Sequence, residues 1–108
     1  MQNQYTLDGA SSSELIRSLS ERVRQRRLEK GMSRKSLSDI SGVPVPTISR
    51  FENQHAISLQ QFLDLTIALG YAEEAQALLS EAKYSSMEEL EQIRQNKERK
   101  HGRRIENK

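Results

Sequence analysis

Apolar residues recur along most of the chain at the three- and four-residue spacing of amphipathic helices. In the first such segment the apolar positions are Leu15, Ile16, Leu19, Val23 and Leu28. Ser12 or Ser13 can cap this segment, and Gly31 follows it, as a helix C-terminus prefers. The pattern predicts a first helix over residues 14–30, preceded by a flexible polar arm over residues 1–12.

A short second helix is predicted over residues 34–41, with Ser33 as its N-cap. Leu37 and Ile40 stand three residues apart in this segment, so we expect both to face the core. The sequence Gly42-Val43-Pro44 then ends this helix, because glycine and proline interrupt regular secondary structure.

A third helix is predicted over residues 46–53, with Ile48 and Phe51 on its inward face. A proline in the first turn of a helix is harmless, since its missing N–H would have had no partner there. The residue before a proline, however, disfavours the helical backbone. We therefore expect Val45 to stay outside this helix, which then begins at Pro46.

The fourth predicted helix starts at Ser58, and Gln61 three residues later completes a capping-box pattern. This helix stops at Gly70, and a fifth follows over residues 72–83. No alternation of apolar and polar residues typical of strands accompanies these segments. The fold class predicted from the pattern is all-α.

The last part of the chain differs in character from the rest. Ser86 and Glu89 signal one more helix start, but beyond Asn96 the chain is charged and has no core-forming pattern. We expect three regions: the arm, a domain over residues 13–83, and a short helix with a basic, disordered tail over residues 84–108.

Composition narrows the class of protein. The chain has 108 residues, 34% of them hydrophobic, and no cysteine, which excludes disulfides and thiolate metal sites and fits a cytoplasmic protein. Its two histidines, His55 and His101, have no third ligand nearby in the sequence, so no metal and no cofactor is expected. No nucleophile stands beside an oriented base, no phosphate-binding glycine loop is present, and no signal or membrane segment is found. We expect neither an enzyme nor a membrane protein.

Charge is distributed unevenly, although the net charge is only +2. Residues 17–50 hold nine basic and three acidic residues. Residues 51–93 hold one basic and eight acidic residues, and residues 94–108 hold seven basic and two acidic residues. A basic region suits a polyanion, but solvated helix faces would give a similar distribution. The motifs must decide between the two.

Two short helices joined by a glycine turn form a unit that fits a DNA duplex, because the major groove admits one α-helix. The segment that contains this unit carries several motifs in register: Val23-Arg24-Gln25-Arg26-Arg27, Gly31-Met32-Ser33, Leu37, Gly42-Val43 and Thr47-Ile48-Ser49-Arg50-Phe51-Glu52-Asn53. From Leu19 to Gly70 the chain resembles the Cro/Xre (lambda-repressor-like) helix-turn-helix family. That resemblance implies a five-helix DNA-binding domain, which agrees with the five helices counted above.

The resemblance also implies structural roles. Gly42 matches the turn glycine, at which a positive φ is tolerated. Arg27 and Glu52 match a structural ion pair between the first and third helices. The small core that holds the second and third helices together would consist of Leu37, Val43, Ile48 and Phe51.

The DNA-binding residues implied by the resemblance are Arg34, Pro44, Val45, Pro46, Thr47, Ser49 and Arg50. Arg34 would contact a phosphate, and Thr47 would lie nearer the DNA backbone than the bases. Family members often have polar residues where this chain has Pro44-Val45-Pro46, and these side chains cannot donate hydrogen bonds. Arg50 is then the one long donor able to grip a guanine edge, so direct readout is expected to be sparse.

One helix-turn-helix reads few base pairs, so we expect a homodimer on an inverted repeat of double-stranded DNA. The basic end of the chain is similar to that of HipB-like antitoxins, which implies a repressor of its own operon and a HipA-like kinase toxin as partner. Two alternatives remain open: a stand-alone phage or plasmid repressor, and a protein-interaction module without specific DNA binding. The tail, residues 94–108, is expected to strengthen binding to DNA or to an acidic partner.

Overall fold

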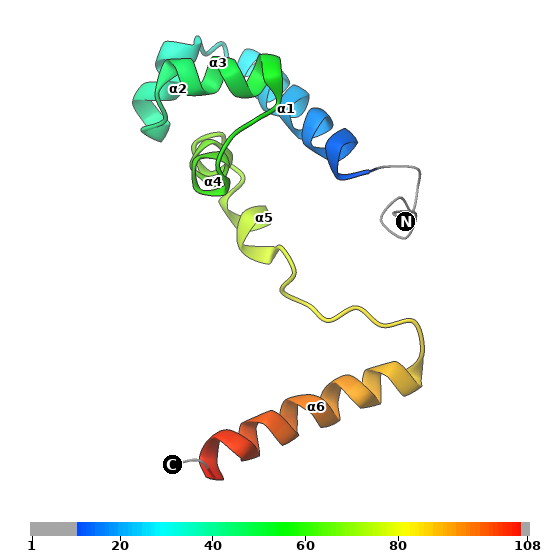
Figure 1. Ribbon diagram of the computed structural model, residues 1–108. Coiled ribbons are helices and arrows are strands. Elements are labelled where there is room, and N and C mark those ends of the chain that lie inside the picture. The colour runs from blue at the N-terminus through cyan, green and yellow to red at the C-terminus, as the bar shows by residue number, and fades with distance from the viewer. Residues whose placement is uncertain (1–10, 107–108) are drawn as a thin grey trace. The chain divides into compact units, whose positions relative to one another are not determined.

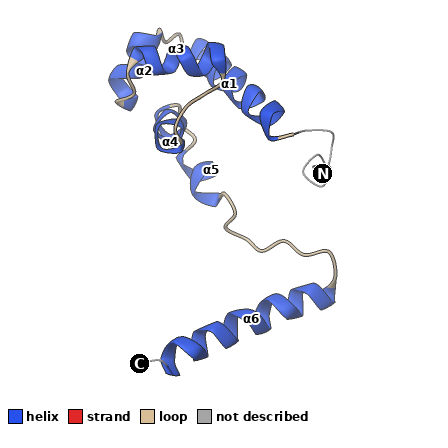
Figure 2. Ribbon diagram, in the orientation of Figure 1, coloured by secondary structure: helices blue, strands red, loops and turns tan. Residues whose placement is uncertain are grey.

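The computed structural model describes residues 11–106, with side chains described as far as residue 99, and shows six helices and no strand in this part of the chain (Figures 1 and 2). The helices are α1 (Ser12–Glu29), α2 (Arg34–Ser41), α3 (Val45–Gln54), α4 (Leu59–Ala68), α5 (Ala72–Ala77) and α6 (Met87–Glu106). The all-α prediction is confirmed. Residues 1–10 of the predicted arm lie outside the described residues. The chain divides into two compact units, one ending at Gln76 and the other beginning at Ala77.

The start of α1 is set by Ser11, and the prediction of Ser12 or Ser13 as its cap was wrong. The Ser11 hydroxyl accepts a hydrogen bond from the Glu14 backbone N–H at 3.3 Å, and the Ser11 N–H donates to the Glu14 carboxylate at 3.1 Å. This reciprocal pair requires the glutamate to stand three residues after the cap. Glu14 therefore selects Ser11 and leaves Ser12 inside the helix.

Helix α2 has the predicted bounds, and Ser33 caps it by accepting a hydrogen bond from the Ser36 N–H at 3.0 Å. Gly42 ends the helix in the left-handed region, with φ of 79°. A side chain at this backbone conformation would be strained, since only glycine adopts it at little cost. The turn thus depends on Gly42.

The expectation that α3 begins at Pro46 was wrong, because Val45 is its first residue. The Pro44 carbonyl accepts the first bond of the helix, from the Ile48 N–H at 3.1 Å. Pro46 therefore stands in the first turn, where the N–H groups have no partner within the helix and proline removes nothing. The steric bias against Val45 is outweighed by the closed helical turn.

The core of the first unit consists of seven buried side chains: Val23, Leu37, Val43, Ile48, Phe51, Leu65 and Leu69. Phe51 lies edge-on to the ring of Phe62, with 5.9 Å between ring centroids. Helices α2 and α4, α1 and α3, and α2 and α3 pack in pairs around this core. The inward placement of Ile48 and Phe51 is confirmed.

The expectation that Ile40 is buried was wrong, since 59% of its surface is exposed. Helix α2 has eight residues, and the chain reverses at Gly42 directly after it. Val43, which follows that turn, is buried with Leu37. Val43, the residue after the turn, therefore contributes to the core, whereas Ile40, the second apolar position of α2, stays at the surface.

Helix α5 ends at Ala77, six residues before the predicted end. The apolar residues directly after this end are not covered, because Leu78 is exposed and Leu79 is fully exposed, with φ of 58°. Without burial of these side chains, nothing favours continuing the helix, because tertiary packing supplies most helical stability in proteins.

Beyond Asn96, where the sequence pattern predicts a disordered tail, α6 continues to Glu106. Its start is capped by Ser86, whose hydroxyl accepts a hydrogen bond from the Glu89 N–H at 3.1 Å. Acidic residues occupy its first turn, and basic residues predominate from Arg94 onward. The acidic first turn suits the helix dipole, so local interactions favour the start of the helix although its described side chains form no core.

None of the described helices combines the length and the apolar character needed to cross a membrane. Among the described side chains, no group of three His, Asp or Glu residues is arranged to hold a metal ion.

Candidate nucleic-acid interface

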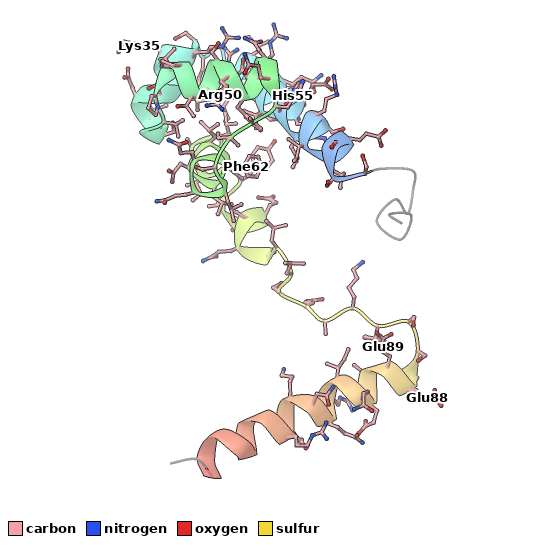
Figure 3. All side chains as sticks on the ribbon, in the orientation of Figure 1. Lys35, Arg50, His55, Phe62, Glu88 and Glu89 are labelled. Carbon is pink, nitrogen blue, oxygen red and sulfur yellow. The ribbon has the colours of Figure 1, made fainter. Side chains whose placement is uncertain are left out.

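Helix α3 presents one face to the core and the other to solvent. Ile48, Phe51 and Glu52 are buried, whereas Pro46 and Arg50 are exposed. Figure 3 labels Arg50 on this helix. Because residues on one side of a helix recur every three to four positions, a chain with 48, 51 and 52 inward must turn 46 and 50 outward. The structure therefore gathers two of the predicted DNA-binding residues on the free side of α3.

The remaining predicted residues of this group border that side. Pro44, the N-cap of α3, is exposed, and Val45, Thr47 and Ser49 are half-buried. Their partial burial leaves part of each side chain open to a ligand. The Ser49 hydroxyl also accepts a hydrogen bond from the Asn53 amide at 3.3 Å.

Arg50 has no hydrogen-bond or salt-bridge partner among the described residues. Its neighbours on α3 are uncharged except for Glu52, which points to the opposite side. A guanidinium in this setting is free to meet a planar acceptor pair such as the O6 and N7 atoms of guanine.

Arg27 and Glu52 form a buried ion pair that joins α1 to α3. Arg27 Nε donates to Glu52 Oε2 at 2.8 Å, and Arg27 Nη2 donates to Glu52 Oε1 at 2.9 Å. Arg27 Nη1 also donates to the Met32 carbonyl at 2.9 Å. A buried charge is tolerated only when it is paired and hydrogen-bonded, and both groups meet that condition. The pair fixes the orientation of α3 against α1.

Arg34 is the third member of this cluster. Its Nε and Nη2 atoms both lie 3.1 Å from Glu52 Oε1, and 35% of its side chain is exposed. The structure therefore places Arg34 on the acidic partner of Arg27, with one side open to solvent. A phosphate contact by Arg34 would have to be made from this position or in exchange for Glu52.

A further contact between α1 and α3 involves Ser20 and His55, which the sequence did not single out. The fully buried Ser20 hydroxyl lies 2.8 Å from the Arg17 carbonyl and 2.6 Å from His55 Nδ1. A carbonyl can only accept, so the single hydroxyl hydrogen goes to Arg17, and both bonds are made when Nδ1 donates. His55 caps the end of α3 with φ of 63°.

One sequence signal for Ser20 does exist. Ser20, Val23 and Arg27 stand at i, i+3 and i+7 on α1, and all three are buried. Serine and arginine count as polar in a hydrophobic pattern, so that pattern contains only Val23 of these three residues, and among its other members Leu15, Ile16 and Leu28 are exposed. The two polar residues of the buried three are the ones that hold α3.

Comparison with known proteins agrees with this geometry. Residues 23–75 match the family described as helix-turn-helix. Neither the curated proteins nor the solved structures gave a significant match. The matched segment includes α2, α3 and α4 with the adjoining parts of α1 and α5. The Cro/Xre resemblance of this segment is thus supported: residues 23–75 match a helix-turn-helix family of the Cro/C1 type, and this match supports a DNA-binding regulator.

Proposed function

We propose that this protein is a transcriptional repressor that binds an inverted-repeat operator as a homodimer. The observation that carries the proposal is the free side of α3, where Arg50 is exposed and without a partner among the described residues while the opposite side is anchored to α1. A rigidly held helix with one long donor suits readout from the major groove.

Each residue of the interface has a role that follows from its chemistry. Arg50 donates two hydrogen bonds to a guanine edge, and Val45 and Pro46 press against thymine methyl groups. Ser49 donates to a base edge once its hydroxyl faces the groove, while Pro44 and Thr47 lie beside the DNA backbone. Because few of these groups donate hydrogen bonds, DNA shape supplies part of the specificity.

Arg34 is assigned to a phosphate next to the second helix. Glu52 retains the two hydrogen bonds from Arg27 if Arg34 leaves it, so the carboxylate stays paired. The exposed side of the Arg34 guanidinium can approach a phosphate with its remaining N–H groups. Phosphate contacts of this kind set the position of the protein on the duplex and carry no sequence information.

The finer assignment is to an antitoxin of the HipB type, which represses its own operon and binds a HipA-like kinase toxin. A small helix-turn-helix unit followed by a separate helical unit favours it, since the second unit is available for a protein partner. Co-purification of the chain with a kinase-like protein encoded beside it would support this assignment. Operator binding without such a partner would favour a stand-alone phage or plasmid repressor.

The experiment that tests the DNA-binding proposal is protection mapping upstream of the protein's own gene, with Arg50→Ala and Arg50→Lys beside the unmodified chain. Arg50→Ala should lower the preference for the operator by about 1–3 kcal/mol per half-site, without unfolding the protein. Arg50→Lys retains the charge but loses the planar fork, so it should also lose selectivity. An operator preference equal to that of the unmodified chain in both variants would remove Arg50 from the interface. Failure of the unmodified chain to protect any duplex would favour a protein-interaction module.

A further inference from the structure

Helix α6 is divided along its axis into an acidic and a basic half. The first seven residues, 87–93, contain three acidic residues and no basic one, whereas residues 94–106 contain six basic and two acidic residues. The helix has 20 residues and is therefore about 30 Å long, of which the basic half occupies about 20 Å. A strong positive charge is thus concentrated on one half of one helix.

The described basic side chains of α6 are only weakly engaged by the chain itself. Arg94 lies 3.6 Å from Glu91, and both side chains are exposed, so water and salt screen the pair. Arg99 donates to the neutral Asn96 amide oxygen at 2.6 Å, and Lys97 has no partner among the described residues. These cations are available to an external anion.

The described part of the unit that contains α6 has no core of its own. None of its described side chains is buried, and its half-buried apolar residues, Leu90 and Ile93, belong to the acidic half. The described part of the basic half, residues 94–99, is polar and exposed. A partner that docks there must bind by charge, because little apolar surface is available to bury.

We infer that the basic half of α6 binds the phosphate backbone of double-stranded DNA, as a second contact beside the helix-turn-helix. A duplex carries one negative charge per about 1.7 Å of its axis, so a 20 Å helical segment spans several phosphates of one strand. Arg94 and Lys97 stand three residues apart and therefore on neighbouring positions of one helix side. Nine residues, 78–86, connect α6 to α5 without regular structure and can extend to about 30 Å.

The inference rests on the proposed function in one respect, that the chain binds a duplex, but it does not depend on base readout by α3. The full chain is titrated with the operator duplex and with an unrelated duplex of equal length, at several salt concentrations. Each phosphate contact contributes about 0.9 to the slope of log affinity against log salt. The triple variant Arg94→Gln/Lys97→Gln/Arg99→Gln should flatten the slope by about 2–3 per chain on both duplexes. The protected bases should not change.

Two matched controls separate contact from net charge. Lys83→Gln removes one positive charge from the exposed connecting segment, so it should change the slope less than Lys97→Gln, which should lower it by about 0.9. Arg94→Lys/Arg99→Lys retains the charges and should retain the slope. Helical circular dichroism of each variant reports whether α6 persists. If the triple substitution unfolds α6, the salt slopes of the two single variants, Lys97→Gln and Lys83→Gln, test the inference instead.

The outcomes distinguish this inference from the proposed function. A slope equal to that of the unmodified chain in the triple variant, with operator preference intact, overturns the role of α6 and leaves the repressor proposal standing. If the triple variant keeps the slope of the unmodified chain but no longer co-purifies with a protein that binds the unmodified chain, the basic half is assigned to a protein partner. This result also overturns the inference. A flattened slope on both duplexes without any operator preference supports α6 and overturns sequence-specific repression.

Discussion

Charged side chains are used in opposite ways in the helix-turn-helix and in α6. In the first unit, Arg27 and Glu52 are buried, hydrogen-bonded to each other and responsible for joining two helices. In α6, Arg94 and Glu91 are exposed, and water and salt screen the attraction between their charges. The stability of the fold depends strongly on the partner of a buried charge. An exposed charge contributes little to stability and is available to ligands.

The largest expected effect comes from the core beneath α3. Phe51→Ala should lower the free energy of unfolding by roughly 3–5 kcal/mol, because the ring is buried and packs on Phe62. Thermal unfolding of the full chain measures this loss. Tyr84→Ala is the control, since Tyr84 is exposed in the second unit and should barely shift the transition. Equal shifts of the unfolding temperature in the two variants would contradict the expectation that only the first unit depends on a buried core.

The buried ion pair provides the next test. Glu52→Gln should destabilise the protein by about 3–5 kcal/mol, because Arg27 is left as an unpaired buried cation. Glu91→Gln removes the partner of Arg94 in α6 and should change stability by less than about 1 kcal/mol. Denaturant unfolding of both variants gives the comparison. A small effect of Glu52→Gln would mean that Arg27 reaches solvent when its partner is lost.

The contact between Ser20 and His55 should have an intermediate effect. Ser20→Ala removes the acceptor of the His55 Nδ1 hydrogen and should cost about 1–3 kcal/mol. His55→Asn tests the backbone separately, since asparagine tolerates the left-handed conformation found at this position. If the contact also orients α3, Ser20→Ala should weaken operator binding at temperatures where the protein is still folded. Unchanged operator affinity would limit the contact to stability.

The smallest expected effect concerns the start of α6. Hydrogen bonds from the Ser85 backbone N–H and hydroxyl lower the pKa of the exposed Glu89 carboxyl below its ordinary value of 4.5. The charged form is therefore favoured when the helix is formed, so this contribution is present above the ordinary pKa and is lost as the pH falls through the lowered one. Circular dichroism at 222 nm should show a small loss of helix in that acidic range. Glu89→Gln should remove this step, and its persistence there would assign it to another carboxyl.

Local patterns anticipated much of the fold. Ser33 and Gly42 fixed α2 to the residue, since an N-cap and a left-handed glycine are properties of a few neighbouring positions. The start of α6 at Ser86 was likewise readable from Ser86 and Glu89. Errors arose where a pattern allowed more than one answer. Ser11, Ser12 and Ser13 are all possible caps, and only the side-chain geometry of Glu14 selects one.

The sequence by itself determined the all-α class, the bounds of α2 and the inward side of α3, because caps, turns and helical spacing act over fewer than ten residues. The tertiary structure decided which apolar residues are buried: Val43 is in the core while Ile40 is exposed, and Leu78 and Leu79 are not covered. It also decided that Arg34 joins Glu52 and that Ser20 meets His55, 35 residues away. These outcomes depend on which helices pack together. A one-dimensional pattern describes the faces of a helix and does not specify the neighbour that each face meets.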